Sequence, residues 1–179
     1  MSDYFLTSAR LGFRTWTRAD LPLALSLWGD PEVTRLFTRE PWSAERVAAR
    51  LEEEIRFQET EGMQYWPMFM LADGAFAGVC GLKPYRRAER IPILGFHLMR
   101  SAWGQGIAGE AARAVIGHAF RALPVAALFA GHHPDHHASR RILEKLGFRH
   151  TGEQLYEPTG LMDRVYLLTA AEAADRSLS

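Results

Sequence analysis

This sequence has few of the features that mark secreted, membrane or nucleic-acid-binding proteins. Its 179 residues include one cysteine, Cys80, which excludes an internal disulfide and fits a reducing compartment. Basic and acidic side chains number 21 each, so the formal net charge of zero does not favour a nucleic-acid or membrane-surface partner. No apolar run reaches the roughly 20 residues of a spanning helix, and the N-terminus lacks the apolar core of a signal peptide. We therefore expect a cytoplasmic protein without nucleic-acid or membrane partners.

The chain also lacks internal repeats, low-complexity tracts and linker-like segments. Its length suffices for one domain with a real core, and 47% hydrophobic with 23% charged residues is usual for a globular protein. These features predict a single domain over residues 1–179.

The most informative stretch is a glycine-containing segment from Arg100 to Ala112, which reads R-S-A-W-G-Q-G-I-A-G-E-A-A. A β-rich run (Ile91 to Met99) precedes it, and an alanine-rich helical pattern follows it. Because Gly104, Gly106 and Gly109 have no Cβ, backbone N–H groups there can approach a ligand, and the helix adds its free N-terminal amides. Strand, turn and helix together predict a phosphate-binding site. The alternative is a glycine-rich turn that only starts a helix.

The pattern of the first third is helical with one strand. A strand is expected over Arg10 to Trp16, followed by a helix capped by Thr17 or Asp20, a short helix from Pro31 and a helix capped by Ser43. Its aromatic residues Trp28, Phe37 and Trp42 are interpreted as core residues rather than as a ligand stack.

From Tyr65 the hydrophobic period changes to two, which indicates strands. The expected hairpin joins Tyr65–Ala72 to Ala75–Leu82 through Asp73-Gly74, and a charged loop follows over Lys83–Arg90. The apolar run Val125 to Ala130 is typical of a strand covered on both faces. Strand, helix and apolar strand in this order predict a parallel βαβ unit.

The last part of the chain predicts a helix and two closing strands. The helix begins at Pro134-Asp135, turns Ala138, Ile142 and Leu146 inward and ends at Gly147. The strands cover about Arg149–Tyr156 and Met162–Leu168 and are joined near Pro158-Thr159-Gly160.

Three motifs along the chain resemble motifs of one protein family. They are T-S-A-R-L-G-F-R-T-W-T-R-A-D with L-W-G-D-P-E-V, then W-G-Q-G-I-A-G-E-A (Trp103 to Ala111), then P-D-H-H-A-S-R-R-I-L-E-K-L-G-F (Pro134 to Phe148). In order and spacing, over roughly Thr7 to Leu168, they resemble the RimJ/RimL-like branch of the GNAT acyl-CoA N-acyltransferases. The resemblance implies an α+β GNAT fold: a mixed, mostly antiparallel twisted sheet with a parallel βαβ core, splayed open where acetyl-CoA binds.

The resemblance also implies the residues of the acetyl-CoA site. The pyrophosphate loop and helix start correspond to Gly104, Gln105, Gly106, Ile107, Ala108 and Gly109. His136 stands where the family usually has asparagine as a polar contact to the cofactor arm, and Ile93 stands where many relatives carry a carboxylate. A base from the strand that contains Ile93 is therefore not expected.

Acetyl transfer to an amine also needs a polarised carbonyl, a proton acceptor and a proton donor. Where the strands part, the backbone N–H groups of Leu98, Met99 or Arg100 are expected to stabilise the carbonyl oxygen. Ser139 matches the serine of the family's C-terminal motif and is the candidate proton donor to the thiolate, with a structural helix role as the alternative. Glu157 is the candidate base and His97 the runner-up, against a solvated loop glutamate and a core histidine.

The function predicted from the sequence is direct transfer of acetyl from acetyl-CoA to a primary amine, a protein N-terminal α-amine or a small amine, in a ternary complex. A catalytically silent CoA-binding sensor or interaction module is the alternative. A metal site in the cluster His132, His133, His136 and His137 ranks last because Pro134 and Asp135 interrupt any helix through it, so no metal is expected. The expected partners are acetyl-CoA and the amine acceptor, and the choice between a monomer and a homodimer stays open.

Overall fold

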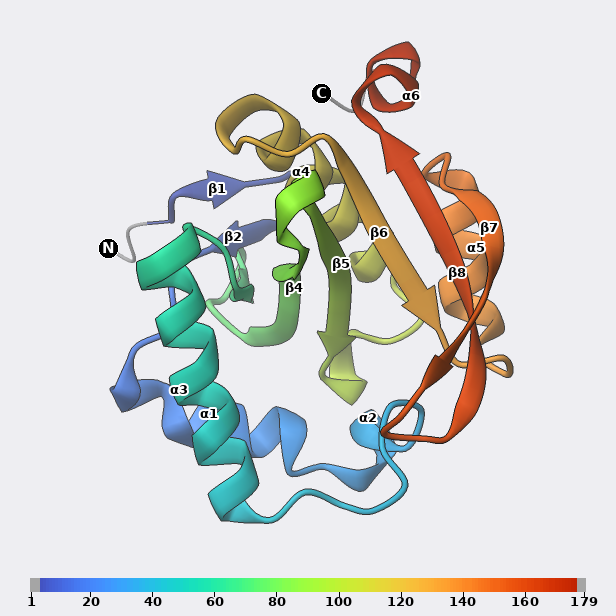
Figure 1. Ribbon diagram of the computed structural model, residues 1–179. Helices are drawn as coiled ribbons and strands as arrows, with labels where there is room; N and C mark the ends of the chain where they lie inside the picture. The colour runs from blue at the N-terminus through green and yellow to red at the C-terminus, as the bar shows by residue number, and fades with distance from the viewer. Residues whose placement is uncertain (1–3, 177–179) are drawn as a thin grey trace.

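One eight-stranded sheet connects the two halves of the chain (Figure 1). This computed structural model describes residues 4–176. The strands are β1 (Leu6–Thr7), β2 (Leu11–Phe13), β3 (Tyr65–Met70), β4 (Phe76–Arg86), β5 (Ile91–Leu98), β6 (Ala127–His132), β7 (Arg149–Tyr156) and β8 (Leu161–Thr169). Their order is β1-β2-β3-β4-β5-β6-β8-β7, and all neighbours are antiparallel except β5 and β6. The predicted mixed, mostly antiparallel sheet with one parallel pair is confirmed.

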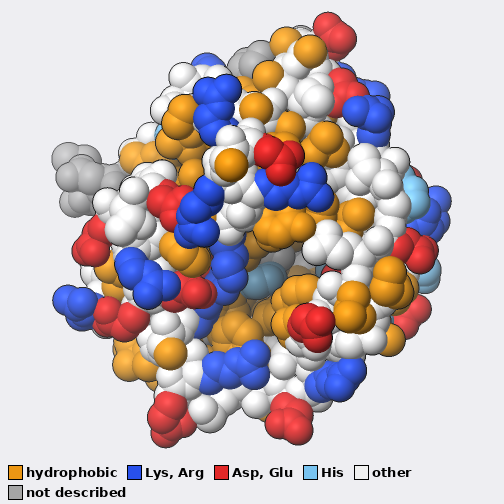
Figure 2. Space-filling model, in the orientation of Figure 1, with side chains coloured by type: hydrophobic (Ala, Val, Ile, Leu, Met, Phe, Trp, Pro, Cys, Tyr) orange, Lys and Arg blue, Asp and Glu red, His pale blue; other side chains and the backbone are white. Residues whose placement is uncertain are grey.

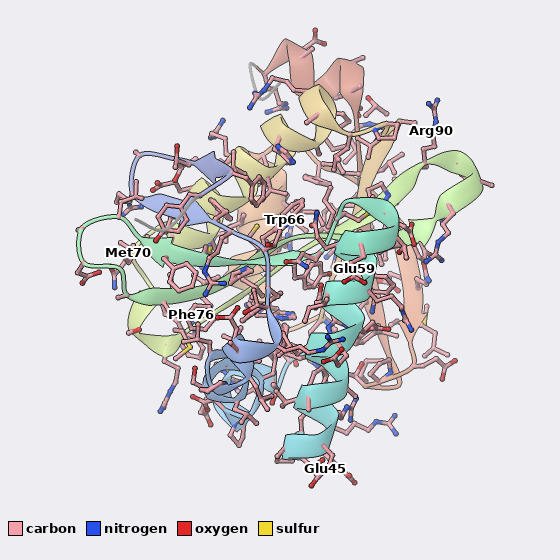
Figure 3. All side chains as sticks on the ribbon, turned by 90° about the vertical axis from the view of Figure 1, so that its left-hand side faces the viewer. Glu45, Glu59, Trp66, Met70, Phe76 and Arg90 are labelled. Atoms are coloured by element: carbon pink, nitrogen blue, oxygen red, sulfur yellow. The ribbon has the colours of Figure 1, made fainter. Side chains whose placement is uncertain are left out.

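Helices cover both faces of this sheet. They are α1 (Leu21–Trp28), α2 (Pro31–Thr34), α3 (Ala44–Glu61), α4 (Ile107–Ala122), α5 (His137–Lys145) and α6 (Ala170–Asp175), with short 3₁₀ turns at η1 (Arg18–Asp20), η2 (Arg87–Glu89) and η3 (Arg100–Ala102). In Figure 1, α3 lies in front of the sheet, α1 runs below the strands, and α4 and α5 lie behind the sheet. Figure 3 shows α3 from the side, running from Glu45 past Glu59, with the hairpin between Met70 and Phe76 projecting away from it.

Local sequence signals account for several of these boundaries. Ser43 caps α3, where its hydroxyl accepts the backbone N–H of Arg46. After α5, Gly147 takes a left-handed φ of 91°, and the N–H of Phe148 donates to the carbonyl of Leu143, as in a Schellman stop. The predicted turn at Asp73-Gly74 is also present, with the Asp73 carboxylate accepting the N–H of Ala75.

Two hydrophobic cores hold the layers together, one on each face. The core behind the sheet contains small α4 residues such as Ala111 and Ala112, which let the helix pack closely against the strands. The core in front is built around Trp28 and Leu51 from α1 and α3. Cys80 on β4 is fully buried, as expected for a small hydrophobe, and burial raises the pKa of its thiol.

The sheet opens between its two parallel strands. Only one pair, Ile93 with Phe129, is in register between β5 and β6, whereas six pairs join β6 to β8. Beyond that pair the C-terminal ends of β5 and β6 diverge, which confirms the predicted splay. The apolar run of β6 is buried from Ala127 to Ala130, as expected for a strand covered on both faces.

Several predicted boundaries were wrong. Strand β4 continues to Arg86 through much of the expected charged loop, and β1 and α6 were not predicted. Helix α5 starts at His137 because the N–H groups of His136 and His137 bond to the carbonyls of His133 and Asp135 in a preceding turn. Its buried face is consequently Ser139 and Leu143, and Ala138 is exposed rather than inward.

Candidate functional site

A large cleft lies where β5 and β6 part. Its volume is about 2120 Å³, well above the roughly 300–1,000 Å³ of a pocket for one small ligand, so it has room for two substrates. Figure 2 shows a hollow in the middle of the face turned to the viewer, with basic side chains gathered on its α3 side. The lining includes the glycine loop, the starts of α4 and α5, the segment between α2 and α3, and the β7–β8 hairpin.

The glycine loop has the shape expected of an anion site. Gly104 and Gly106 take left-handed φ values of 72° and 75°, and a Cβ at Gly104 or Gly109 would meet no atom within 4 Å. Gly106 is the N-cap of α4 and offers no side chain, so the first amides of α4 remain available to a ligand. The side chain of Gln105 donates to the Ser101 carbonyl and stabilises the loop itself. These backbone donors fit the diphosphate of acetyl-CoA.

A clamp behind the loop was not predicted. Glu110 in the first turn of α4 accepts hydrogen bonds from the Ser8 hydroxyl (2.6 Å), the Arg10 backbone N–H (2.8 Å) and Arg10 Nε (2.7 Å). Arg10 Nη1 also donates to the carbonyl of Gln105 (3.1 Å). Burial alone would raise the pKa of Glu110, but the hydrogen bonds from Ser8 and Arg10, with the charge of the Arg10 guanidinium, outweigh burial and lower the pKa. The clamp therefore neutralises a carboxylate that would otherwise repel an anion at this helix start.

The three backbone donors expected at the end of β5 are not equivalent. The N–H of Met99 donates to the carbonyl of Ala77 on β4, so the prediction of an unpaired amide is wrong for Met99. In an antiparallel ladder successive N–H groups point to opposite sides, so the N–H of Leu98 points away from β4 toward the gap. The Arg100 side chain pairs with Asp30, 3.0 Å away, and ties this turn to the segment before α2.

Ser139 and His136 meet at the start of α5. Ser139 is buried, lines the cleft, and its Oγ lies 2.9 Å from His136 Nδ1. Burial lowers the pKa of His136 to about 4, with neighbouring histidines and Arg35 adding to the effect. The imidazole is therefore neutral near pH 7, and it gives the Ser139 hydroxyl an uncharged hydrogen-bond partner.

His97 lines the same cleft, but its hydrogen-bond partner differs from that of His136. The Trp28 indole N–H donates to His97 Nδ1 (3.0 Å), and the ring stacks on Phe37 with centroids 4.2 Å apart. Because Nδ1 accepts, the neutral ring carries its proton on Nε2. Burial, with Arg50 nearby, lowers the pKa of His97 to about 3. His97 therefore offers a neutral N–H donor to the cleft and no free acceptor for a proton.

Glu157 lies apart from these residues. It is exposed in the turn between β7 and β8, and within residues 4–176 the cleft lining includes its neighbours Tyr156 and Pro158 but not Glu157. Two aromatic residues interpreted as core also differ from expectation, since Phe37 and Trp42 are only partly buried and line the cleft.

Two cross-links bridge the opening on the α3 side. Arg39 Nε donates to the carbonyl of Thr159 (2.6 Å), and the Tyr85 hydroxyl donates to Gln154 Oε1 (3.1 Å). They connect the first half of the chain to the β7–β8 hairpin across the splay. Sequence alone indicates neither contact, because the partners lie 120 and 69 residues apart.

The histidine cluster is organised by hydrogen bonds within the protein. His132 Nε2 lies 3.1 Å from the Tyr166 hydroxyl, and His133 Nδ1 accepts the N–H of Asp135. Over the described part of the chain, no group of three or more His, Cys, Asp or Glu side chains is arranged to hold a metal ion. In the same residues, no helix is long and apolar enough to cross a membrane.

Sequence relatives agree with this architecture. The uncharacterized N-acetyltransferase p20 of Bacillus licheniformis is 26% identical over 148 residues, covering 82% of this chain and 83% of that protein. The uncharacterized N-acetyltransferase YoaA of Bacillus subtilis (strain 168) is 26% identical over 149 residues, covering 82% and 84%.

Solved structures share the fold. RimL, a ribosomal L7/L12 alpha-N-protein acetyltransferase solved with coenzyme A, superposes with a TM-score of 0.80 at 17% identity, covering 96% of this chain and 99% of that one. A GNAT-family acetyltransferase from Bacillus anthracis gives a TM-score of 0.78 at 17% identity, covering 92% and 97%. The sequence family described as the acetyltransferase (GNAT) domain matches residues 10–149. With that match over most of its length and the splayed sheet in place, this chain belongs to the GNAT family of N-acetyltransferases.

Proposed function

We propose that this acetyltransferase passes acetyl from acetyl-CoA directly to a primary amine while both substrates are bound. The observation that carries the proposal is one continuous cleft lined from both faces of the sheet. The glycine loop and α5 line it behind the sheet, and Phe37, Trp42 and the β7–β8 hairpin line it in front. Donor and acceptor can therefore enter from opposite faces and meet in the splay.

Residues of this chain have separate tasks in that reaction. When bound, acetyl-CoA supplies a thioester whose carbonyl carbon is open to attack by an amine. The amides of the glycine loop and of the start of α4 would hold the diphosphate, and the N–H of Leu98, which points into the gap, would donate to the carbonyl oxygen. Ser139 gives a proton to the departing sulfur, and neutral His136 beside it orients the hydroxyl. Glu157 stays a predicted base, although its exposure outside the cleft lining does not favour it.

Direct transfer is favoured over a covalent cysteine intermediate. Cys80 is the one cysteine of the sequence, and it is buried in β4. Since burial raises the pKa of its thiol, little thiolate forms near pH 7 to accept an acetyl group.

The acceptor class follows from amine chemistry and from one relative. An α-amine with a pKa near 8 is easier to deprotonate at neutral pH than a lysine near 10.4. RimL acts on the α-amine of ribosomal L7/L12 by its name. A protein N-terminal α-amine is therefore the first acceptor to test, and a small amine is the second.

Initial-rate kinetics with acetyl-CoA and a peptide bearing a free N-terminal serine test the proposal. Thiol release should give intersecting double-reciprocal lines, because both substrates must be bound before transfer. Parallel lines with a burst of thiol release in the absence of peptide would show a covalent acetyl-enzyme and contradict direct transfer. Absence of thiol release with this peptide and with a panel of small primary amines would contradict the amine acceptor.

A further inference from the structure

One carboxylate in the cleft is partly shielded from solvent and yet has no partner among the described residues. Asp163 on β8 lines the cleft and is only partly exposed, yet among residues 4–176 its carboxylate has no hydrogen bond and no ion pair. Its Oδ1 is shielded from solvent without a partner. A shielded polar atom without a partner costs stability and calls for an explanation, such as a catalytic role or a ligand.

Three other acidic side chains around the cleft that are buried or partly buried have cationic partners. Glu54 is fully buried, pairs with Arg50 and accepts the backbone N–H of Tyr65 (2.7 Å). Glu53 is shared among Arg50, Arg56 and Lys83, and Glu110 belongs to the Arg10 clamp. These carboxylates have cationic partners inside the protein, whereas Asp163 has none among the described residues.

The register of the sheet places Asp163 on the face of the β7–β8 hairpin that lines the cleft. Asp163 is opposite Gln154 on β7, and side chains directly opposite in an antiparallel pair share a face. Tyr156 is two residues further along the same strand and therefore on that face too, and all three residues line the cleft. Gln154 Oε1 is occupied by the Tyr85 hydroxyl. Asp163 therefore faces the cleft from the β7–β8 hairpin, which Arg39 and Tyr85 cross-link to the first half of the chain.

We propose that Asp163 receives the acceptor's amine in this cleft and takes its proton. The proposal rests on the proposed acetyl transfer and names the carboxylate that the sequence did not identify. The carboxylate accepts one proton from the acceptor's ammonium, and the freed nitrogen lone pair forms the N–C bond with the carbonyl carbon. The C–S bond breaks, the sulfur is protonated from Ser139, and the proton lost by the new amide nitrogen restores that serine. The net reaction releases one proton, through Asp163, to solvent.

The charges around Asp163 suit this task. His133, which follows β6, is the basic group whose charge acts on the Asp163 carboxyl and lowers its pKa. Tyr156 faces Asp163 from β7. Across the cleft, α3 presents Arg46 and Arg50 toward Tyr156. Burial dominates over His133 and raises the pKa of the Asp163 carboxyl, which makes it a stronger proton acceptor than an exposed aspartate.

The test compares Asp163→Asn with Glu157→Gln and with Glu153→Gln in the full chain. Glu153 is exposed on the same hairpin and lies opposite Arg164, so its side chain is on the other face from Asp163. The probes are a lysine-free peptide with a free N-terminal serine and an α-acetylated peptide with one lysine. The measurement is kcat/KM from pH 6 to pH 10 by thiol release from acetyl-CoA.

At pH 7, Asp163→Asn should lower kcat/KM by about 10²–10⁴, with an unchanged KM for acetyl-CoA. The defect should shrink as rising pH deprotonates the free amine, and it should be smaller for the α-amine than for the lysine. Glu153→Gln should match wild type. The proposal is overturned if Asp163→Asn runs parallel to wild type, or if Glu157→Gln alone shows this pattern.

A second test titrates the Asp163 carboxyl directly and does not depend on turnover. Carbon-13 NMR of aspartate-labelled protein, with the Asp163 signal assigned through its loss in Asp163→Asn, should show a midpoint above the usual value of about 3.9. A midpoint at or below that value would mean a solvated or paired carboxylate and would refute the assignment. If wild type transfers acetyl to no amine, the proposed function fails and the role of Asp163 fails with it; if wild type transfers acetyl and Asp163→Asn matches it, only the role of Asp163 fails.

Discussion

Replacing Gly106 by aspartate tests the diphosphate site against a matched control elsewhere in the chain. Gly106 has φ 75°, and a Cβ at this position would have Arg10 Nη2 as its nearest neighbour, at 3.8 Å. Gly74, in the β3–β4 turn, has φ 72°, and a Cβ there would meet no atom within 4 Å. A non-glycine residue in this conformation costs about 1–2 kcal/mol, so both variants should lose roughly 2–8 °C in Tm.

The two variants should differ in ligand binding. Two like charges about 5 Å apart at an effective dielectric constant of about 20 repel by about 3 kcal/mol, or about a hundredfold in affinity. An aspartate at the N-cap of α4 also competes for the same free amides and for the positive end of the helix dipole. Gly106→Asp should therefore weaken acetyl-CoA binding by about 100-fold or more, and Gly74→Asp should leave it within about twofold.

Isothermal titration of each folded variant with acetyl-CoA measures the difference, and thermal unfolding supplies the stability control. Gly106→Ala separates strain from charge, since it keeps the strained backbone and adds no carboxylate. If Gly106→Asp has the Tm of Gly74→Asp and still binds acetyl-CoA like wild type, the glycine loop does not hold the diphosphate.

Three further predictions concern the groups around the loop and the cleft. Ser139→Ala should lower kcat about 10²–10⁴-fold with little change in acetyl-CoA affinity, and full activity would return Ser139 to a structural role. Arg10→Ala removes the hydrogen bond to the Gln105 carbonyl and the ion pair with Glu110, so the KM for acetyl-CoA should rise about tenfold. The control is Arg87→Ala, which breaks an exposed ion pair with Glu61 outside the cleft and should leave this KM unchanged. The pKa of His97 is about 3 in the folded chain and near 6.5 in the unfolded chain. Between pH 3 and pH 6.5 the unfolded chain therefore binds more protons, and the free energy of unfolding falls as the pH drops. In His97→Gln, chemical denaturation between pH 4 and pH 6.5 should show a slope smaller by at most about 1.4 kcal/mol per pH unit, and an unchanged slope would contradict the buried neutral ring.

The fold was predictable where its signals are local. Ser43 at a helix start, Asp73-Gly74 at a turn and Gly147 at a helix end act within a few residues of themselves. The start of α5 was misplaced because the turn at Pro134-Asp135 satisfies its own N–H groups before the helix begins. The extension of β4 to Arg86 was missed because charged side chains at a strand end can face a cleft, which a one-dimensional pattern does not show.

Like the fold, the site was predictable only where its signals lie close together in the sequence. The glycine loop and Ser139 belong to contiguous motifs, and the structure places both on the cleft. The Arg10 clamp joins residues 100 positions apart, and the local pattern predicts only that Arg10 begins a strand. His97 could not be identified as a neutral donor because its protonation follows from Trp28, 69 residues away.

Asp163 shows why the remaining part of the site lies beyond sequence reasoning. Glu54 is fully buried and Asp163 is partly buried, but Glu54 has Arg50 and a backbone N–H, whereas the carboxylate of Asp163 has no partner among the described residues. A paired buried acid is explained by the fold, since its charge is compensated where the chain places it. An unpaired one costs roughly 1–3 kcal/mol or more that folding alone does not return. Because burial raises the pKa of Asp163, its contribution to stability declines as the pH rises and the carboxyl ionises. An ammonium bound beside Asp163 would give the carboxylate a partner and remove the free-energy cost of leaving it unpaired. The same unpaired carboxylate would therefore lower the stability of the free protein and raise its affinity for an amine.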